Sequence, residues 1–267
     1  ESAEGLLVIG GVDYDAAEGA KEGGARATRQ VPALPATSDE AKAVAERFAS
    51  KFPNVASTLL TEEQATEGAV KRDAPKARFL HVATHGCFDL DHLRVALAGT
   101  HRGPAGMMQK ELTPSDLPNP SAAAQGEGDP LLLSWMALAG SNTGSGGGDE
   151  DGILTASELQ DLDLRGTELV VLSACETGRG ELAAGEGVLG LSHALFIAGV
   201  RSFMLSLWRV PDAETRELMD HFYAGLWGER GLPPGEALRQ AQLAMLARDR
   251  EHDAFRPSTW GAWTVNR

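Results

Sequence analysis

Short runs of apolar residues recur along the chain and are separated by polar and glycine-rich segments. Runs of this length, bounded by turn-forming residues, are typical of buried β-strands. Strands are predicted at 5–10, 55–60, 78–84, 95–98, 131–139, 169–173, 201–207 and 259–265.

Between several of these runs, apolar residues repeat at the spacing of a helix. Ser38 is the predicted N-cap of the first helix, and Thr61–Gln64 matches the capping-box pattern that would open the second. Further helices are predicted at 155–159, 186–198, 213–227 and 234–247. Because strands alternate with helices along most of the chain, the pattern predicts an α/β layer fold with a mainly parallel sheet.

Charge and composition narrow the classes of function. The chain has 267 residues, of which 38 are acidic and 24 basic, giving a net charge of −14. A nucleic-acid binder needs a basic face for phosphates, and docking on anionic lipid needs the same. We therefore expect a protein that binds neither nucleic acid nor a membrane surface.

The cysteine content and the hydropathy indicate a cytoplasmic protein. Cys87 and Cys175 are the two cysteines, too few for a disulfide-stabilised secreted scaffold. The longest apolar run, Gly187–Val200, is shorter than the roughly 20 residues of a membrane span. No signal peptide is evident, and the start at Glu1 instead of Met is typical of a processed or excised domain.

Two predicted strands are followed by residues whose side chains could take part in catalysis. His85 and Gly86 follow the strand at 78–84, and Cys175 follows the strand at 169–173. The carboxyl ends of parallel strands meet at one edge of a sheet, so a nucleophile and a base would meet there. His85 can take the thiol proton and return it to a leaving amine, while the backbone N–H groups of Gly86 and Cys175 can stabilise an oxyanion.

Several motifs together resemble the CHAT domain family, caspase-like cysteine peptidases related to separase. The resemblance covers nearly the whole chain, as a single domain over 1–267. It rests on the segments at 80–86, 151–158, 169–178, 185–191, 198–202, 206–212 and 237–242.

The resemblance implies a three-layer α/β/α caspase-like fold and a catalytic dyad of His85 and Cys175. It also implies that the backbone N–H groups of Gly86 and Cys175 are the oxyanion donors. Asp13, Trp208 and Asp212 are the candidate S1 residues, and an acid there favours Arg or Lys at P1. An alternative for Asp212 is a cap on the helix that follows it.

From this resemblance we expect a cysteine endopeptidase that cleaves a specific partner protein and needs no cofactor. Activation would come from a sensor or an upstream helical-repeat domain, in bacterial or antiviral defence or in cell death. Arg179, in the loop after the nucleophile, is the candidate self-cleavage site.

Other interpretations stay open. The domain could be a catalytically silent interaction module, or a different thiol acyl-transfer enzyme. His81 and His85 are spaced like paired zinc ligands, but the intervening Val82 and the strand pattern favour a core role for His81. Gly185–Gly190 matches the dinucleotide fingerprint, although a strand does not lead directly into it, so close helix packing is favoured.

Overall fold

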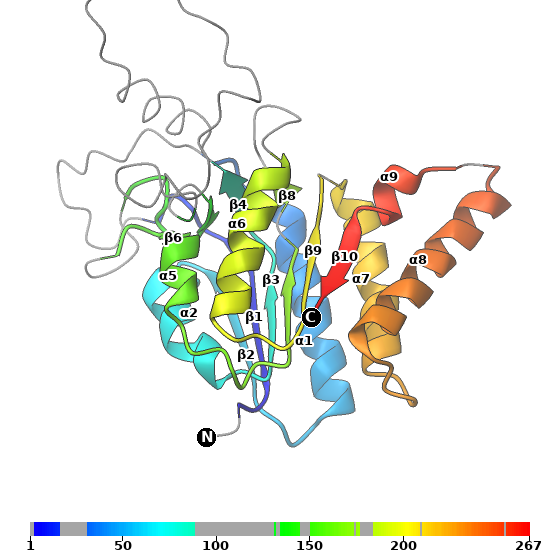
Figure 1. Cartoon of the computed structure of the whole chain (residues 1–267), viewed down its shortest axis with the longest axis horizontal. Coiled ribbons are helices and arrows are strands. Elements are labelled where there is room, and N and C mark those ends of the chain that lie inside the picture. Colours follow the sequence, from blue (N-terminus) through cyan, green and yellow to red (C-terminus); the bar gives the residue numbers. More distant parts are fainter. Residues whose placement is uncertain are drawn as a thin grey trace, which may run out of the picture.

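A six-stranded sheet forms the centre of the chain in the computed structural model (Figure 1). Its strands lie in the order β10-β9-β7-β3-β1-β2, and every neighbouring pair is parallel except β10 and β9. The strands are β1 (Leu6–Val12), β2 (Ser57–Glu62), β3 (Phe79–Val82), β7 (Leu169–Leu172), β9 (Phe203–Ser206) and β10 (Trp263–Asn266).

The structure describes most but not all of the chain. The described residues are 3–16, 31–88, 131, 134–144, 150–173, 175–176, 184–208, 210–253 and 255–267. The predicted strand at 95–98 and the candidate self-cleavage residue Arg179 lie outside them.

Helices cover both faces of the sheet, which confirms the predicted three-layer architecture (Figure 1). Helices α1, α7 and α8 pack on one face, and α2, α5 and α6 on the other. The helices are α1 (Pro35–Lys51), α2 (Glu67–Asp73), the 3-10 helix Ala74–Lys76, α5 (Ala156–Gln160), α6 (Ala184–Ile197), α7 (Asp212–Leu226), α8 (Pro234–Glu251) and α9 (Pro257–Trp260). Over the described ranges, none of these helices is long and apolar enough to cross a membrane.

Alternate residues of each strand enter alternate cores, as the two-residue period of a strand requires. On β1, Leu6 and Val8 pack toward α1 and α7, whereas Leu7 and Ile9 pack toward α2, α5 and α6. Both faces are buried, which explains why the strands read as continuous apolar runs in the sequence.

A smaller sheet extends the carboxyl edge of the main one. It has the order β6-β5-β4-β8, formed by β4 (His85–Phe88), β5 (Ser134–Ala137), β6 (Ile153–Thr155) and β8 (Cys175–Glu176). β4 follows β3 after two residues, and β8 follows β7 after two residues. The two central strands of the main sheet therefore each continue into the small sheet.

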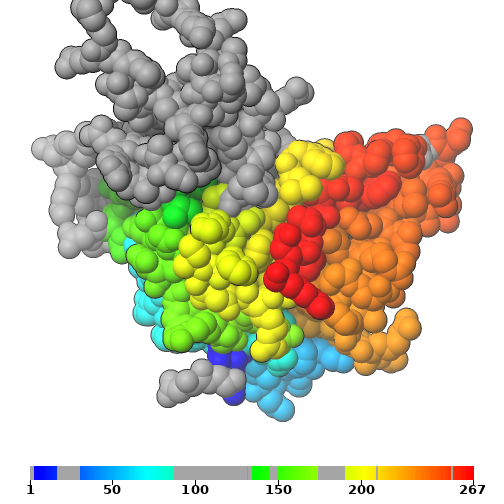
Figure 2. All heavy atoms as spheres, viewed as in Figure 1, coloured from blue at the N-terminus to red at the C-terminus, as the bar shows by residue number. Residues whose placement is uncertain are grey.

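The C-terminal strand closes one side of the main sheet. Trp263 of β10 pairs with Ser206 of β9 in antiparallel register. In Figure 2 the C-terminal residues, in red, lie directly beside the residues near 200, in yellow. The predicted strand at 259–265 is only partly right, because its first residues belong to α9 and the strand begins at Trp263.

Both predicted caps of the first two helices are wrong. α1 begins at Pro35, so Ser38 lies inside the helix. Thr61 belongs to β2, and α2 begins later, with the Thr66 side chain accepting from the Ala69 N–H. A capping box does exist at α5, where Thr155 and Glu158 bond reciprocally.

Helix α1 packs unusually close to β1 because glycines occupy the contact. A Cβ at Gly10 would lie 2.5 Å from the carbonyl oxygen of Thr37 and 2.7 Å from the Cβ of Ala41. Gly11 has φ +61° and faces Ser38 in the same way. A side chain at either position would push the start of α1 away from the sheet.

We therefore expect Gly10→Ala to lower the free energy of unfolding by about 1–3 kcal/mol, because the added methyl group overpacks the contact. The control is Gly68→Ala in α2, where no described atom lies within 4 Å of the added Cβ. This control should unfold at the same or a higher urea concentration than the wild type. Equal urea midpoints for Gly10→Ala and the wild type would contradict the close packing.

Candidate active site

The smaller sheet pairs the two predicted dyad residues directly. β4 and β8 are parallel neighbours, with His85 in register with Cys175 and Gly86 with Glu176. Neighbouring strands lie about 4.8 Å apart, so the backbones of the two residues are adjacent. The register thus brings together two residues that lie 90 positions apart in the chain, while their chemical roles stay predictions.

The ring of His85 is held in a defined orientation. It is 2% exposed, and its Nε2 lies 2.7 Å from the carbonyl oxygen of Pro32. Because a carbonyl only accepts hydrogen bonds, Nε2 carries the hydrogen, and Nδ1 of the neutral ring is the atom that can accept a proton. The ring of Tyr14 packs against His85 with 5.3 Å between the centroids.

The residue before His85 fixes the start of β4. The Thr84 hydroxyl donates to the carbonyl oxygen of Ala137 on β5, 2.6 Å away. Since that bond uses the only hydroxyl hydrogen of Thr84, the hydroxyl of Tyr14 donates to Thr84 Oγ1, at 2.9 Å. Tyr14 therefore links the end of β1 to the strand that carries His85.

The candidate S1 residues flank this pair on the same edge of the sheet. Asp13 follows β1, and its carboxylate accepts from the N–H of Asp15 at 3.0 Å. Trp208 follows β9, is 40% exposed, and donates from Nε1 to the carbonyl oxygen of Ser258 at 2.8 Å. In the strand order, β3 and β7 lie between these two ends, so the candidate dyad sits between Asp13 and Trp208.

Asp212 is the first residue of α7 and is exposed. The N-cap position is occupied by Pro211, so the alternative that Asp212 caps the helix is wrong. Its carboxylate still lies in the first turn, where the helix dipole favours a negative charge.

His81 is a core residue, as predicted. It is fully buried on β3, with Nδ1 2.8 Å from the hydroxyl of Tyr223 and Nε2 3.2 Å from a carboxylate oxygen of Glu40. Burial, followed by the nearby Glu40 charge, raises the pKa of Tyr223, so its hydroxyl stays protonated and donates to Nδ1. His81 thus links β3 to α1 and α7, while His85 contacts Pro32, so the two rings do not share a metal-binding geometry.

The glycine motif at 185–190 lies inside helix α6, which begins at Ala184. A dinucleotide fingerprint instead needs a tight turn directly after a strand.

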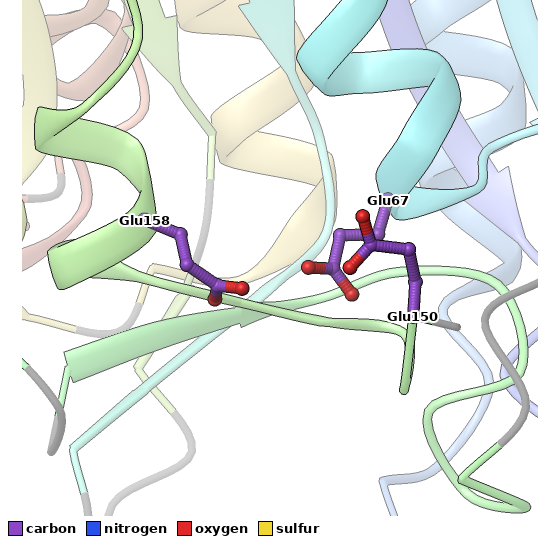
Figure 3. Close-up of side chains that lie close together, drawn as sticks. All are labelled: Glu67, Glu150 and Glu158. Atoms are coloured by element: carbon purple, nitrogen blue, oxygen red, sulfur yellow. The ribbon is translucent and has the colours of Figure 1, made fainter.

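The structure contains a cluster of charged residues that the sequence analysis did not predict. Glu67, Glu150 and Glu158 each place a carboxylate oxygen within 4.8 Å of the others (Figure 3). Lys71 Nζ lies 2.6 Å from Glu67, 3.1 Å from Glu150 and 3.0 Å from Glu158. The lysine supplies the positive charge to this cluster, and it ties α2 to the segment that carries β6 and α5.

The cluster holds more negative than positive charge, and Glu67 is its buried member. Glu67 is 1% exposed, and its Oε2 accepts from the N–H of Gly152 at 3.2 Å. Burial raises the pKa of Glu67 to about 8, although the contact with Lys71 acts in the opposite direction. The spacing of these residues, up to 91 positions from Glu67 to Glu158, gives no local signal in the sequence.

We expect this cluster to make stability depend on pH. A carboxyl whose pKa is higher in the folded protein than the ordinary 4.5 stabilises the folded state most at low pH. This contribution to the free energy of unfolding is lost as the pH rises toward 8. The Glu67 contribution falls by at most about 1.4 kcal/mol per pH unit in that window. Urea unfolding between pH 5 and 8 should therefore show a smaller decline for Glu67→Gln than for the wild type, whereas exposed Glu63→Gln should follow the wild type. Parallel curves for all three proteins would refute the assignment.

The sequence is similar to a protein family over nearly its whole length and to two curated proteins over most of it. The profile of the CHAT domain family matches residues 1–266. Tetratricopeptide repeat protein 28 of Mus musculus is 28% identical over 207 residues, which is 77% of this chain, and the Homo sapiens protein is 27% identical over 239 residues, which is 87%. The matched region is 8% of the length of each relative.

The fold is similar to that of a solved cysteine proteinase, the Arg-specific gingipain R. The two structures superpose with a TM-score of 0.51 and 10% sequence identity, covering 98% of this chain and 45% of the gingipain chain. The likeness supports the caspase-like fold.

Proposed function

This chain belongs to the CHAT domain family, and on that premise we propose that it is a cysteine endopeptidase with Cys175 as nucleophile and His85 as general base and acid. The observation that supports this most strongly is the register of β4 and β8, which pairs His85 with Cys175 in the fold of a cysteine proteinase. A silent interaction module has no need of both residues at this position.

The orientation of His85 suits the reaction. With the hydrogen on Nε2 donated to Pro32, Nδ1 is the atom that takes the proton from the Cys175 thiol. The thiolate attacks the peptide carbonyl, and the resulting oxyanion accepts hydrogen bonds from the N–H groups of Gly86 and Cys175. The C–N bond then breaks as Nδ1–H protonates the leaving amine, and water, deprotonated by Nδ1, hydrolyses the thioester.

The polypeptide substrate would enter between the ends of β1 and β9. Asp13 follows β1, Asp212 begins α7 after β9, and both acids are exposed. Trp208, which follows β9, presents an exposed aromatic surface. A basic P1 side chain is the complement of such acids. We therefore assign Arg or Lys to P1.

The natural substrate is a specific partner protein, and an additional region of protein would control the cleavage. Both mammalian relatives are tetratricopeptide repeat proteins, and this domain matches 8% of their length. This supports control by a helical-repeat region or a sensor. A role in defence or cell death is part of the same proposal and rests on the family alone.

The proposal predicts that a diverse peptide pool is cut by the protein and not by its Cys175→Ala or His85→Ala variants, as measured by mass spectrometry. Loss of the nucleophile or the base should lower the rate by at least about 10³-fold. Cys87→Ala is the matched control and should keep full activity. Cuts that persist in Cys175→Ala would exclude this dyad.

We expect Asp212→Asn and Asp13→Asn to reduce cleavage after Arg and Lys, because each removes a negative charge from the candidate S1 pocket. A loss of about 10- to 100-fold in kcat/KM for basic P1, with no loss for uncharged P1, is the expected result. The measurement uses paired peptides that differ only at P1. Equal losses for both peptide classes would place the two acids outside the pocket.

A further inference from the structure

The carbonyl that orients His85 belongs to a short segment, in which the partly buried Val31 side chain packs against the hydrophobic core. Residues 31–34 form neither helix nor strand in the described structure, and Pro32 is exposed. Even so, the Pro32 carbonyl oxygen lies 2.7 Å from His85 Nε2. Side chains from outside the segment add hydrogen bonds that hold it in place.

Asn142 holds one side of Pro32. Its Oδ1 accepts from the N–H of Val31 at 2.8 Å, and its Nδ2 donates to the carbonyl oxygen of Val31 at 3.0 Å. Asn142 is itself fixed, since its N–H donates to the Tyr14 carbonyl at 2.9 Å and its Nδ2 also donates to Asp15 Oδ1 at 2.9 Å. The asparagine side chain thus pairs with Val31 as a neighbouring strand would, 111 residues away in the chain.

Thr37 holds the other side. Its hydroxyl donates to the carbonyl oxygen of Leu34 at 2.7 Å, and Thr37 Oγ1 accepts from the N–H of Gly11 at 3.0 Å. The Thr37 N–H donates to the same Leu34 carbonyl at 3.2 Å. Because Gly11 belongs to β1, this bond connects residues 31–34 to the central sheet.

We propose that Asn142 and Thr37 are positioning residues for His85. They hold Pro32 from its two sides and so keep its carbonyl at Nε2, which fixes the tautomer with the hydrogen on Nε2 and the acceptor lone pair on Nδ1. Neutral imidazole has two tautomers, and the partner of one nitrogen sets which is present. Without a fixed Pro32 carbonyl, the tautomer with hydrogen on Nδ1 gains population, and that form cannot take a proton at Nδ1.

The tautomer can be measured without any assay of activity. Nitrogen-15 spectra of histidine-labelled protein at pH 8, above the ordinary histidine pKa of about 6.5, distinguish the protonated from the unprotonated ring nitrogen. Assignment of the His85 signals comes from a His85→Gln spectrum. The Tyr14 ring packs against His85, and the titratable residues Cys175 and Glu176 belong to the strand paired with β4, so every variant is compared at the same pH.

We expect the wild type to hold the hydrogen on Nε2, and Asn142→Ala and Thr37→Val to show a mixture of tautomers. Thr37→Ser keeps the hydroxyl and should match the wild type. Thr167→Val is the matched control, because it removes another buried threonine hydroxyl, bonded at 2.9 Å to the Ala77 carbonyl at the opposite end of the sheet. It should leave the His85 signals unchanged.

The consequence for catalysis rests on the proposed function. In a peptidase assay, we expect kcat to fall about 5- to 10-fold in Asn142→Ala and Thr37→Val, with KM unchanged. A loss of this size corresponds to about one hydrogen bond that positions the Pro32 carbonyl. Folded Asn142→Ala with the wild-type tautomer and rate would overturn the inference, even if Thr37→Val does not fold. Absence of peptidase activity in the wild type would count against the proposed function only, because the tautomer spectra still decide the positioning role.

Discussion

Backbone hydrogen bonds between β3 and β7, at the centre of the sheet, hold Phe79–Val82 and Leu169–Leu172 in parallel register. Both strands are buried on both faces, and a slip of one residue would exchange the two cores. The register continues two residues beyond each strand into β4 and β8, where it pairs His85 with Cys175. The packing of the apolar core therefore fixes the relative position of the two polar residues on which the proposed chemistry depends.

Polar side chains then fix what the sheet alone leaves free. The Glu40, His81 and Tyr223 contacts tie two helices to β3, and the Thr84 bonds to Ala137 and Tyr14 fix the start of β4. Buried polar groups are costly unless they are paired, so such contacts specify one arrangement of the surrounding elements. These contacts connect the strands of the proposed active site to the elements around them, and the Lys71 cluster attaches β6 and α5 to α2.

The sequence predicted a mainly parallel sheet alternating with helices because apolar runs and helical periods are local signals, and the resemblance to the CHAT family implied helices on both faces. It placed His85 and Cys175 at strand ends for the same reason. It failed at Ser38 and Thr61, because Ser and Thr also occur inside helices and strands, and α1 begins instead at Pro35, a residue that favours the first position of a helix. Asp13 and Asp212 are exposed, and their part in an S1 pocket stays a prediction.

The sequence by itself determined the approximate positions of the main-sheet strands, the class of fold and the two residues of the candidate dyad, since each depends on residues close together in the chain. Only the tertiary structure decided the strand order, the register and the tautomer of His85. Those features depend on contacts between distant residues, such as His85 with Pro32, 53 positions away, and Asn142 with Val31, 111 positions away. Such contacts leave no periodic signal in the sequence, because they arise from the path of the folded backbone and not from the residues beside them.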